Sequence, residues 1–120
     1  MRKAVSIFSL LLSVMIFSTC SKEIGPLHDT SCDSVDNTYL TGIRPILDSN
    51  CAVPGCHESG FLPGDYTSYT GIKAKADAGS LENRLFILGD MPPATFPQYA
   101  LTPEELQQFR CWINAGAPNN

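Results

Sequence analysis

Two cysteines and a histidine stand close together in the stretch CAVPGCHESG of this 120-residue chain. Cys51 and Cys56 are separated by four residues, and His57 follows directly. In the pattern C-x-x-C-H, both sulfurs bond the vinyl groups of a haem, and the histidine is placed beneath the iron. Here Pro54-Gly55 can form a tight turn that shortens the gap between the sulfurs. The stretch therefore predicts covalent attachment of haem c, with His57 as the proximal iron ligand.

A second iron ligand is expected from later in the chain, and in small c-type cytochromes it is often a methionine. Met91 is followed by Pro92 and Pro93, whose fixed φ and missing N–H keep this loop from coiling into a helix. A stiff loop of this kind can hold a thioether at an iron. The alternatives are a methionine that fills the core, His28 as the distal ligand in place of Met91, and an open distal position.

The first 19 residues are predicted to be a signal peptide, because a basic start is followed by a charge-free apolar run of sixteen residues. That run is short for a membrane span. It ends in FSTC, which resembles a bacterial lipobox and implies that Cys20 is lipidated. An ordinary signal peptide cut nearby and an uncleaved anchor are the alternatives. The expected organisation is residues 1–19 as signal peptide, 20–35 as lipidated N-terminus and tether, and 36–120 as one domain.

Composition favours a small acidic domain outside the cytoplasm. Removal of the leader takes away Arg2 and Lys3, which leaves six Lys and Arg against twelve Asp and Glu, a net charge of −6. No basic patch points to nucleic acid. No internal repeat is visible, and neither is a constellation of catalytic base and nucleophile, so the chain is not expected to be an enzyme.

A first helix is predicted from about Gly42 to Asn50, directly before the cysteine motif. It starts no earlier because a helix tolerates proline only within its first turn, and Pro45 must fall there. Tyr39 and Leu40 are expected to be extended.

Two further helices are predicted in the middle of the chain. Gly79 is expected to end the first, Ser80 to cap the second, and Gly89 to stop it. Their apolar faces recur at helical spacing, and they comprise Tyr69, Ile72 and Ala76 in the first and Leu81, Leu85 and Leu88 in the second.

The last helix has the strongest terminal signals. Thr102 and Glu105 form a capping-box pattern at its start, and Gly116 is suited to the position after its end. Cys111 lies off its apolar stripe and can face a different neighbour. The buried face is expected to contain Leu106, Phe109 and Ile113, with Trp112 beside them. No strand pattern appears, so the domain is predicted to be all-α.

Together these motifs resemble the monohaem cytochrome c domains of bacterial envelope lipoproteins, in a C-x4-C-H variant. The resemblance spans residues 36–120 and rests on Ile43, Pro45, Ile46, Leu47, Asn50, Cys51, Cys56, His57, Met91, Pro92, Pro93, Trp112, Ile113, Gly116 and Ala117. It implies a small cytochrome c-like fold, with the first and last helices packed around a haem crevice. It also implies one covalent haem c whose iron is held by His57 and Met91. The implied role is electron transfer between redox partner proteins of the cell envelope, with the lipid as the membrane anchor.

The remaining cysteines are expected to pair. If Cys20 is lipidated, four cysteines remain in an oxidising compartment, and three connectivities are open. With Cys51 and Cys56 on the haem, the resemblance implies that Cys32 and Cys111 meet where the first and last helices touch. Such a bridge would close a loop of ~80 residues and would contribute roughly 4 kcal/mol in the chain-entropy model.

Two other classes of function remain open at this point. One is a haemless secreted binding or structural module, in which Cys51–Cys56 and Cys32–Cys111 are both disulfides. The other is a zinc clip formed by Cys51, Cys56 and His57, although structural zinc requires four ligands and no fourth lies nearby.

Overall fold

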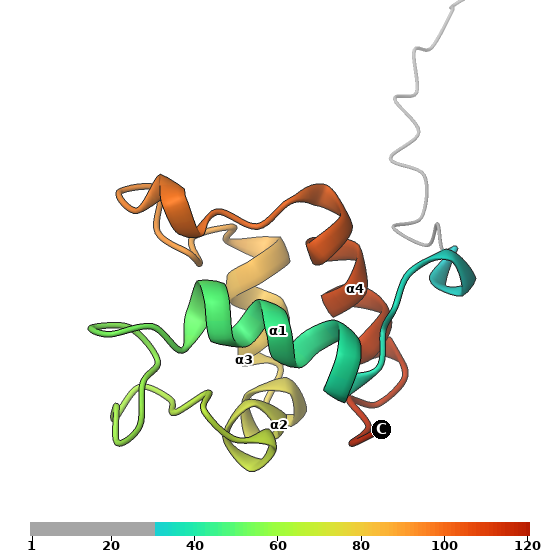
Figure 1. The fold of residues 1–120 in the computed structure, drawn as a ribbon, viewed down its shortest axis with the longest axis horizontal. Helices are drawn as coiled ribbons and strands as arrows, with labels where there is room; N and C mark the ends of the chain where they lie inside the picture. The colour runs from blue at the N-terminus through green and yellow to red at the C-terminus, as the bar shows by residue number, and fades with distance from the viewer. Residues whose placement is uncertain (1–30) are drawn as a thin grey trace, which may run out of the picture.

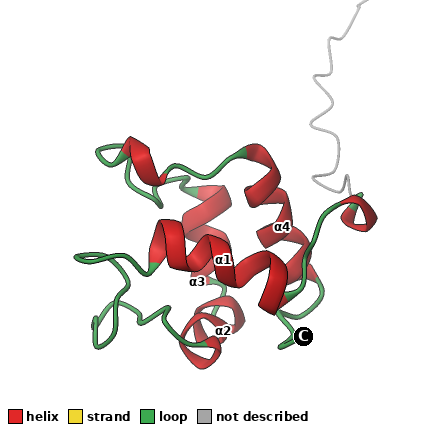
Figure 2. Cartoon of the chain, in the orientation of Figure 1, coloured by secondary structure: helices red, strands yellow, loops and turns green. Residues whose placement is uncertain are grey.

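The computed structural model describes residues 31–120, and in that range the chain is helical with no strand (Figures 1 and 2). The predicted all-α class is therefore confirmed. The elements are η1 (Cys32–Ser34), η2 (Tyr39–Ile43), α1 (Arg44–Ile46), η3 (Leu47–Cys51), α2 (Tyr69–Asp77), α3 (Ser80–Glu82), η4 (Asn83–Ile87), η5 (Pro97–Tyr99) and α4 (Pro103–Asn114). The predicted signal peptide, Cys20 and His28 lie outside the described residues.

The first helical run joins η2, α1 and η3 and begins three residues earlier than predicted. Tyr39, expected to be extended, is the first helical residue, because the chain's last residue supplies its acceptors. The Tyr39 N–H donates to Asn120 Oδ1 at 3.0 Å, and the Leu40 N–H donates to the Asn120 carbonyl at 2.9 Å. The first turn is a π turn, in which the Arg44 N–H donates to the Tyr39 carbonyl. Pro45 therefore lies in the second turn of the continuous run and not in its first turn as predicted.

The pattern D-x-T-x-x-T-G-I occurs twice, at residues 36–43 and 65–72, so the expectation of no internal repeat was wrong. In both copies the aspartate accepts hydrogen bonds from the N–H and the hydroxyl of the threonine two residues later. In both copies the isoleucine is fully buried. The glycine approaches the aspartate backbone so closely that an added Cβ would lie 1.9 Å from the Asp36 carbonyl oxygen and 1.7 Å from that of Asp65. Each copy thus builds the start of one helix against the core.

The middle helices follow the predicted pattern with two differences. Ser80 is the first residue of α3 and does not cap it; its hydroxyl donates to the Lys75 carbonyl at 3.1 Å, and Gly79 in the left-handed region precedes the helix. Leu81 and Leu85 are buried as expected, but Leu88 is 56% exposed. The reason is that η4 is a π turn, which holds more residues than an α turn and rotates Leu88 off the stripe.

The last helix, α4, has the predicted ends. Thr102 and Glu105 form the capping box, with hydrogen bonds of 3.2 and 2.7 Å, and Gly116 adopts φ +86° after the helix. Phe109 and Trp112 are fully buried. The predicted buried face is therefore correct, with Leu106 and Ile113 packed partly against the core.

The two ends of the domain pack together on α4. The Tyr39 ring stacks on Trp112 with centroids 6.0 Å apart, and it meets Tyr69 edge-on at 4.9 Å. Cys32 and Cys111 form a disulfide with their Cα atoms 5.6 Å apart, which fixes η1 against α4. The expected pairing is confirmed, and Cys111 reaches its partner from outside the apolar stripe.

We predict that Gly71→Ala destabilises the domain. A Gly→Ala change inside a helix normally stabilises by up to about 1 kcal/mol. Here the new methyl group would collide with the Asp65 carbonyl, and we expect a loss of roughly 2 kcal/mol or more. Urea unfolding followed by circular dichroism measures the difference. Ala74→Ser, an exposed change on the same helix, is the matched control, and equal stability of the two variants would contradict the prediction.

Candidate functional site

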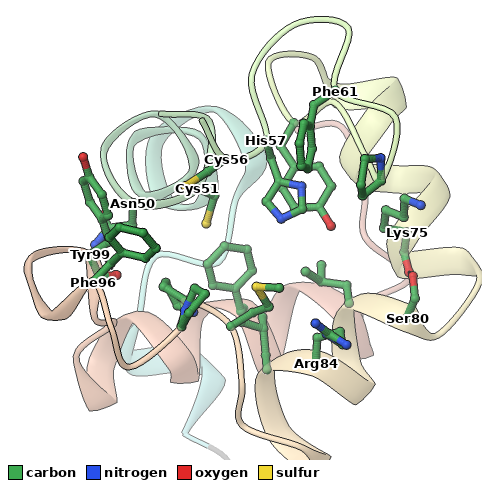
Figure 3. Close-up of a pocket in the computed structure, with 18 of the residues that line it drawn as sticks. Asn50, Cys51, Cys56, His57, Phe61, Lys75, Ser80, Arg84, Phe96 and Tyr99 are labelled. Carbon is green, nitrogen blue, oxygen red and sulfur yellow. Dashed lines mark hydrogen bonds between the residues drawn. The ribbon is translucent and has the colours of Figure 1, made fainter. Parts of the chain in front are cut away.

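A cavity of about 540 Å³ opens between the end of η3, the loop that follows it, the α3–η4 segment and the loop before η5 (Figure 3). Its size falls within the ~300–1,000 Å³ that is typical of cofactor and ligand pockets. Cys51, Cys56, His57 and Met91, the four residues predicted to hold a haem, all line it. They come from two segments far apart in the sequence, and the fold brings them to one space.

The four-residue spacer between the cysteines folds back on itself as predicted. The Cys56 N–H donates to the Val53 carbonyl at 3.0 Å, and Gly55 adopts φ +81° within the turn. The His57 N–H then donates to the Cys51 carbonyl at 2.9 Å, so the histidine returns to the end of the helix. Both cysteines are free thiols in this structure. The spacer therefore presents two thiols and an imidazole to the same cavity.

The His57 ring is held on three sides. Its Nδ1 lies 2.9 Å from the Gly64 carbonyl oxygen. Because a carbonyl only accepts hydrogen bonds, Nδ1 carries the proton, and the lone pair of the neutral ring is on Nε2. The ring also stacks on Tyr66 at 3.9 Å and meets Phe61 edge-on at 5.6 Å. This combination of a fixed tautomer and a fixed ring plane is typical of a histidine that binds a metal through Nε2.

Gly64, which the sequence analysis did not single out, is required by this arrangement. It is buried with φ +152°, and an added Cβ would lie 2.9 Å from both the Tyr66 ring and Lys75 Cε. A side chain here would push the carbonyl away from His57. The only sequence signal was the Pro63-Gly64 pair, which marks a turn but not its partner.

The Met91 loop is fastened at both ends. Before Met91, the Asp90 N–H donates to the Arg84 carbonyl at 3.1 Å, and the two side chains form a salt bridge of 3.0 Å. After it, the Asn50 side-chain amide donates to the Tyr99 carbonyl at 3.2 Å. Asn50 directly precedes Cys51, so the loop with the thioether is tied to the helix with the first thiol.

Burial controls the ionisation of two groups in the cavity. It raises the pKa of the Cys51 thiol to about 12, with smaller contributions from the negative charges of Cys56 and Glu105. It also raises the pKa of Tyr66 to about 12; the charge of Cys51 adds to this rise, and Arg84 opposes it. Both side chains are therefore neutral near pH 7, as expected for a space poor in water.

The aromatic residues Tyr66 and Phe96 line the cavity. Tyr69 instead packs in the core and donates its hydroxyl to Ala117, and Phe86 lies beneath the Arg110 guanidinium. Arg84 lines the cavity as well.

Lys75, which was not predicted as a site residue, also lines the cavity. The sequence pattern that could have indicated Lys75 is its position three residues after Ile72, which places it at the edge of the apolar face of the same helix.

Within residues 31–120, no three His, Cys, Asp or Glu side chains come together to hold a bare metal ion. In the same range, no helix is both long and apolar enough to cross a membrane. Comparisons of the chain with protein-family models, with curated proteins and with solved structures found no match.

We predict that the protein with Cys51 as a free thiol loses stability at alkaline pH because this thiol is buried. The thiol ionises near pH 9.0 in the unfolded chain and near 12 in the folded one, so its contribution is complete below pH 9 and is lost as pH rises. At pH 10.5 the loss is about 2 kcal/mol relative to pH 8. Unfolding free energies of the wild type and Cys51→Ala at both pH values measure it. Cys56→Ala should keep the loss, and an unchanged slope in Cys51→Ala would refute the assignment.

Proposed function

We propose that this protein is a monohaem c-type cytochrome that transfers electrons in the bacterial cell envelope. One observation carries the proposal: two free thiols, a histidine with its Nε2 lone pair available and the Met91 thioether all line one apolar cavity. These are the donors that covalent haem requires for attachment and for axial ligation. When bound, haem c would supply an iron that cycles between the ferric and ferrous states.

The cysteines would hold the group covalently. Each thiol would add across one vinyl group: sulfur would bond to one vinyl carbon and the thiol hydrogen would go to the other, so that no oxidant would be consumed. The turn at Pro54-Gly55 lets the four-residue spacer serve where two residues are usual.

The two residues proposed to bind the iron differ in how firmly the chain holds them. His57 is fixed by the Gly64 carbonyl, which makes Nε2 a better donor. Met91 depends on its loop, which Arg84 and Asn50 anchor. Ligation by His and Met raises the reduction potential relative to two histidines. The apolar lining would exclude water and limit solvent reorganisation as the iron changes charge.

The haemless disulfide-stapled module fits fewer of the observations. The Cys32–Cys111 bridge suits both readings, but the module also requires a Cys51–Cys56 disulfide, and these two cysteines are free thiols. It assigns no role to the cavity or to the fixed tautomer of His57. A zinc clip is disfavoured in the described part of the chain because no third and fourth ligand join the two thiols.

The test is expression of the exported protein together with a cytochrome c maturation system. We expect haem that survives a denaturing gel and a low-spin visible spectrum in the reduced state. Met91→Ala should lose the low-spin spectrum and lower the reduction potential, because its sulfur would no longer bind the iron. Leu88→Ala, an exposed change near the same loop, should alter neither property.

Two outcomes would count against this assignment. A colourless protein, when a co-expressed control cytochrome matures normally, would reject the cytochrome function. An unchanged spectrum and potential in Met91→Ala would keep the function but remove Met91 as the distal ligand.

We further propose that Cys20 is lipidated and anchors the domain to a membrane, with residues 21–35 as the tether. This part rests on the leader sequence, which lies outside the described residues. Cys20→Ser should move the protein from the membrane fraction to the soluble fraction, whereas Ser21→Ala should stay on the membrane. Cell fractionation with mass spectrometry of the N-terminal peptide decides the matter, and membrane retention of unmodified Cys20→Ser would argue for an uncleaved anchor.

A further inference from the structure

The charged side chains that line the cavity have one sign. Residues 31–120 contain ten Asp and Glu against five Lys and Arg. Among the described residues that line the cavity there is no carboxylate, and the two that carry a charge are Lys75 and Arg84. In an acidic domain, an apolar cavity that excludes every carboxylate and keeps two cations is suited to a ligand with an apolar body and an anionic end.

These two cations lie together at one side of the cavity. Figure 3 shows Lys75, Ser80 and Arg84 on one side and Asn50 and Tyr99 on the opposite side. The Ser80 hydroxyl donates to the Lys75 carbonyl, which ties the start of α3 to the end of α2. The effect of Arg84 on the pKa of Tyr66 indicates that the guanidinium charge reaches the cavity wall.

Both cations keep donors available for a ligand. Within residues 31–120 Lys75 forms no ion pair, whereas Lys73 on the same helix pairs with Asp77. Arg84 uses Nε for Asp90, which leaves the terminal nitrogens of its guanidinium without a partner in the described chain. Lys75 Cε lies close to Gly64, so the side chain of Lys75 packs beside the segment that orients His57.

We infer that Lys75 and Arg84 form a carboxylate-binding site at one end of the cavity, which holds the propionates of the proposed haem and so orients the ring before it is attached. The identity of the ligand rests on the proposed function, but the carboxylate chemistry does not. With its propionates at this site, the opposite edge of the ring faces the thiol side of the cavity. Binding to the cations thus brings the vinyl groups to Cys51 and Cys56 without any covalent step.

The inference is tested on the exported and processed protein, prepared without haem from cells that lack the attachment machinery. Fluorescence titration compares a metal-free porphyrin dicarboxylate with its dimethyl ester, which has the same ring and no charge. We expect the dicarboxylate to bind at least about tenfold more tightly, since each charge-assisted contact contributes a factor of several. Lys75→Gln should weaken dicarboxylate binding about three- to tenfold, leave the ester unchanged, and be rescued by Lys75→Arg.

Lys73→Gln is the matched control, because it removes the same charge from the same helix on a side that does not line the cavity. It should bind both porphyrins like the wild type. Equal affinity for the dicarboxylate and the ester, or equal effects of Lys73→Gln and Lys75→Gln, would overturn the carboxylate site.

The outcomes separate this inference from the proposed function. If the protein stays colourless after maturation but prefers the dicarboxylate through Lys75, the carboxylate site is supported and the cytochrome function is rejected. If the protein takes up haem but Lys75→Gln has no effect on the porphyrin preference, the cytochrome function is supported and the carboxylate site is rejected.

Discussion

The burial of Trp112 between the two ends of the domain is the contact on which the rest of the structure depends. Its ring stacks on Tyr39 at the start of the first helical run, and its indole N–H donates to the Pro118 carbonyl near the chain's end. Residues after α4 then return to cap that run through Asn120. Removal of a fully buried Trp typically costs about 3–5 kcal/mol. The Cys32–Cys111 disulfide also joins the start of the domain to α4.

The packing of the first helical run against α4 determines where the cavity forms. Because α4 and the first helical run are held together, the end of η3 is a fixed point, and the cysteine turn projects from it. Phe109 of α4 is fully buried in the core and also lines the cavity. The α3–η4 segment supplies a second wall, and Asn50 ties the Met91 loop across the gap. The cysteine turn and the Met91 loop, which border the cavity, are thus both attached to the first helical run.

The neutral and the charged groups that line the cavity lie in different places. The interior presents sulfur, imidazole and aromatic groups, and burial keeps Cys51 and Tyr66 neutral. Cations stand at one side only, and the domain's many carboxylates are kept off the wall. Such an asymmetric wall gives a ligand one preferred orientation, since an anionic end is stabilised at the cations and costs free energy anywhere else.

Local sequence determined the features that depend on near neighbours. The capping box of α4, the buried face with Phe109 and Trp112, and the turn at Pro54-Gly55 all follow from residue types a few positions apart. The types of the residues also nominated Cys51, Cys56, His57 and Met91 as one site. Only the tertiary structure decided what depends on distant partners. Asn120 sets the start of the first helix, the Gly64 carbonyl selects the tautomer of His57, and the packing of α2 brings Lys75 to the cavity. A sequence pattern reports periodicity along the chain, but an acceptor or a cation supplied from elsewhere leaves no periodic trace.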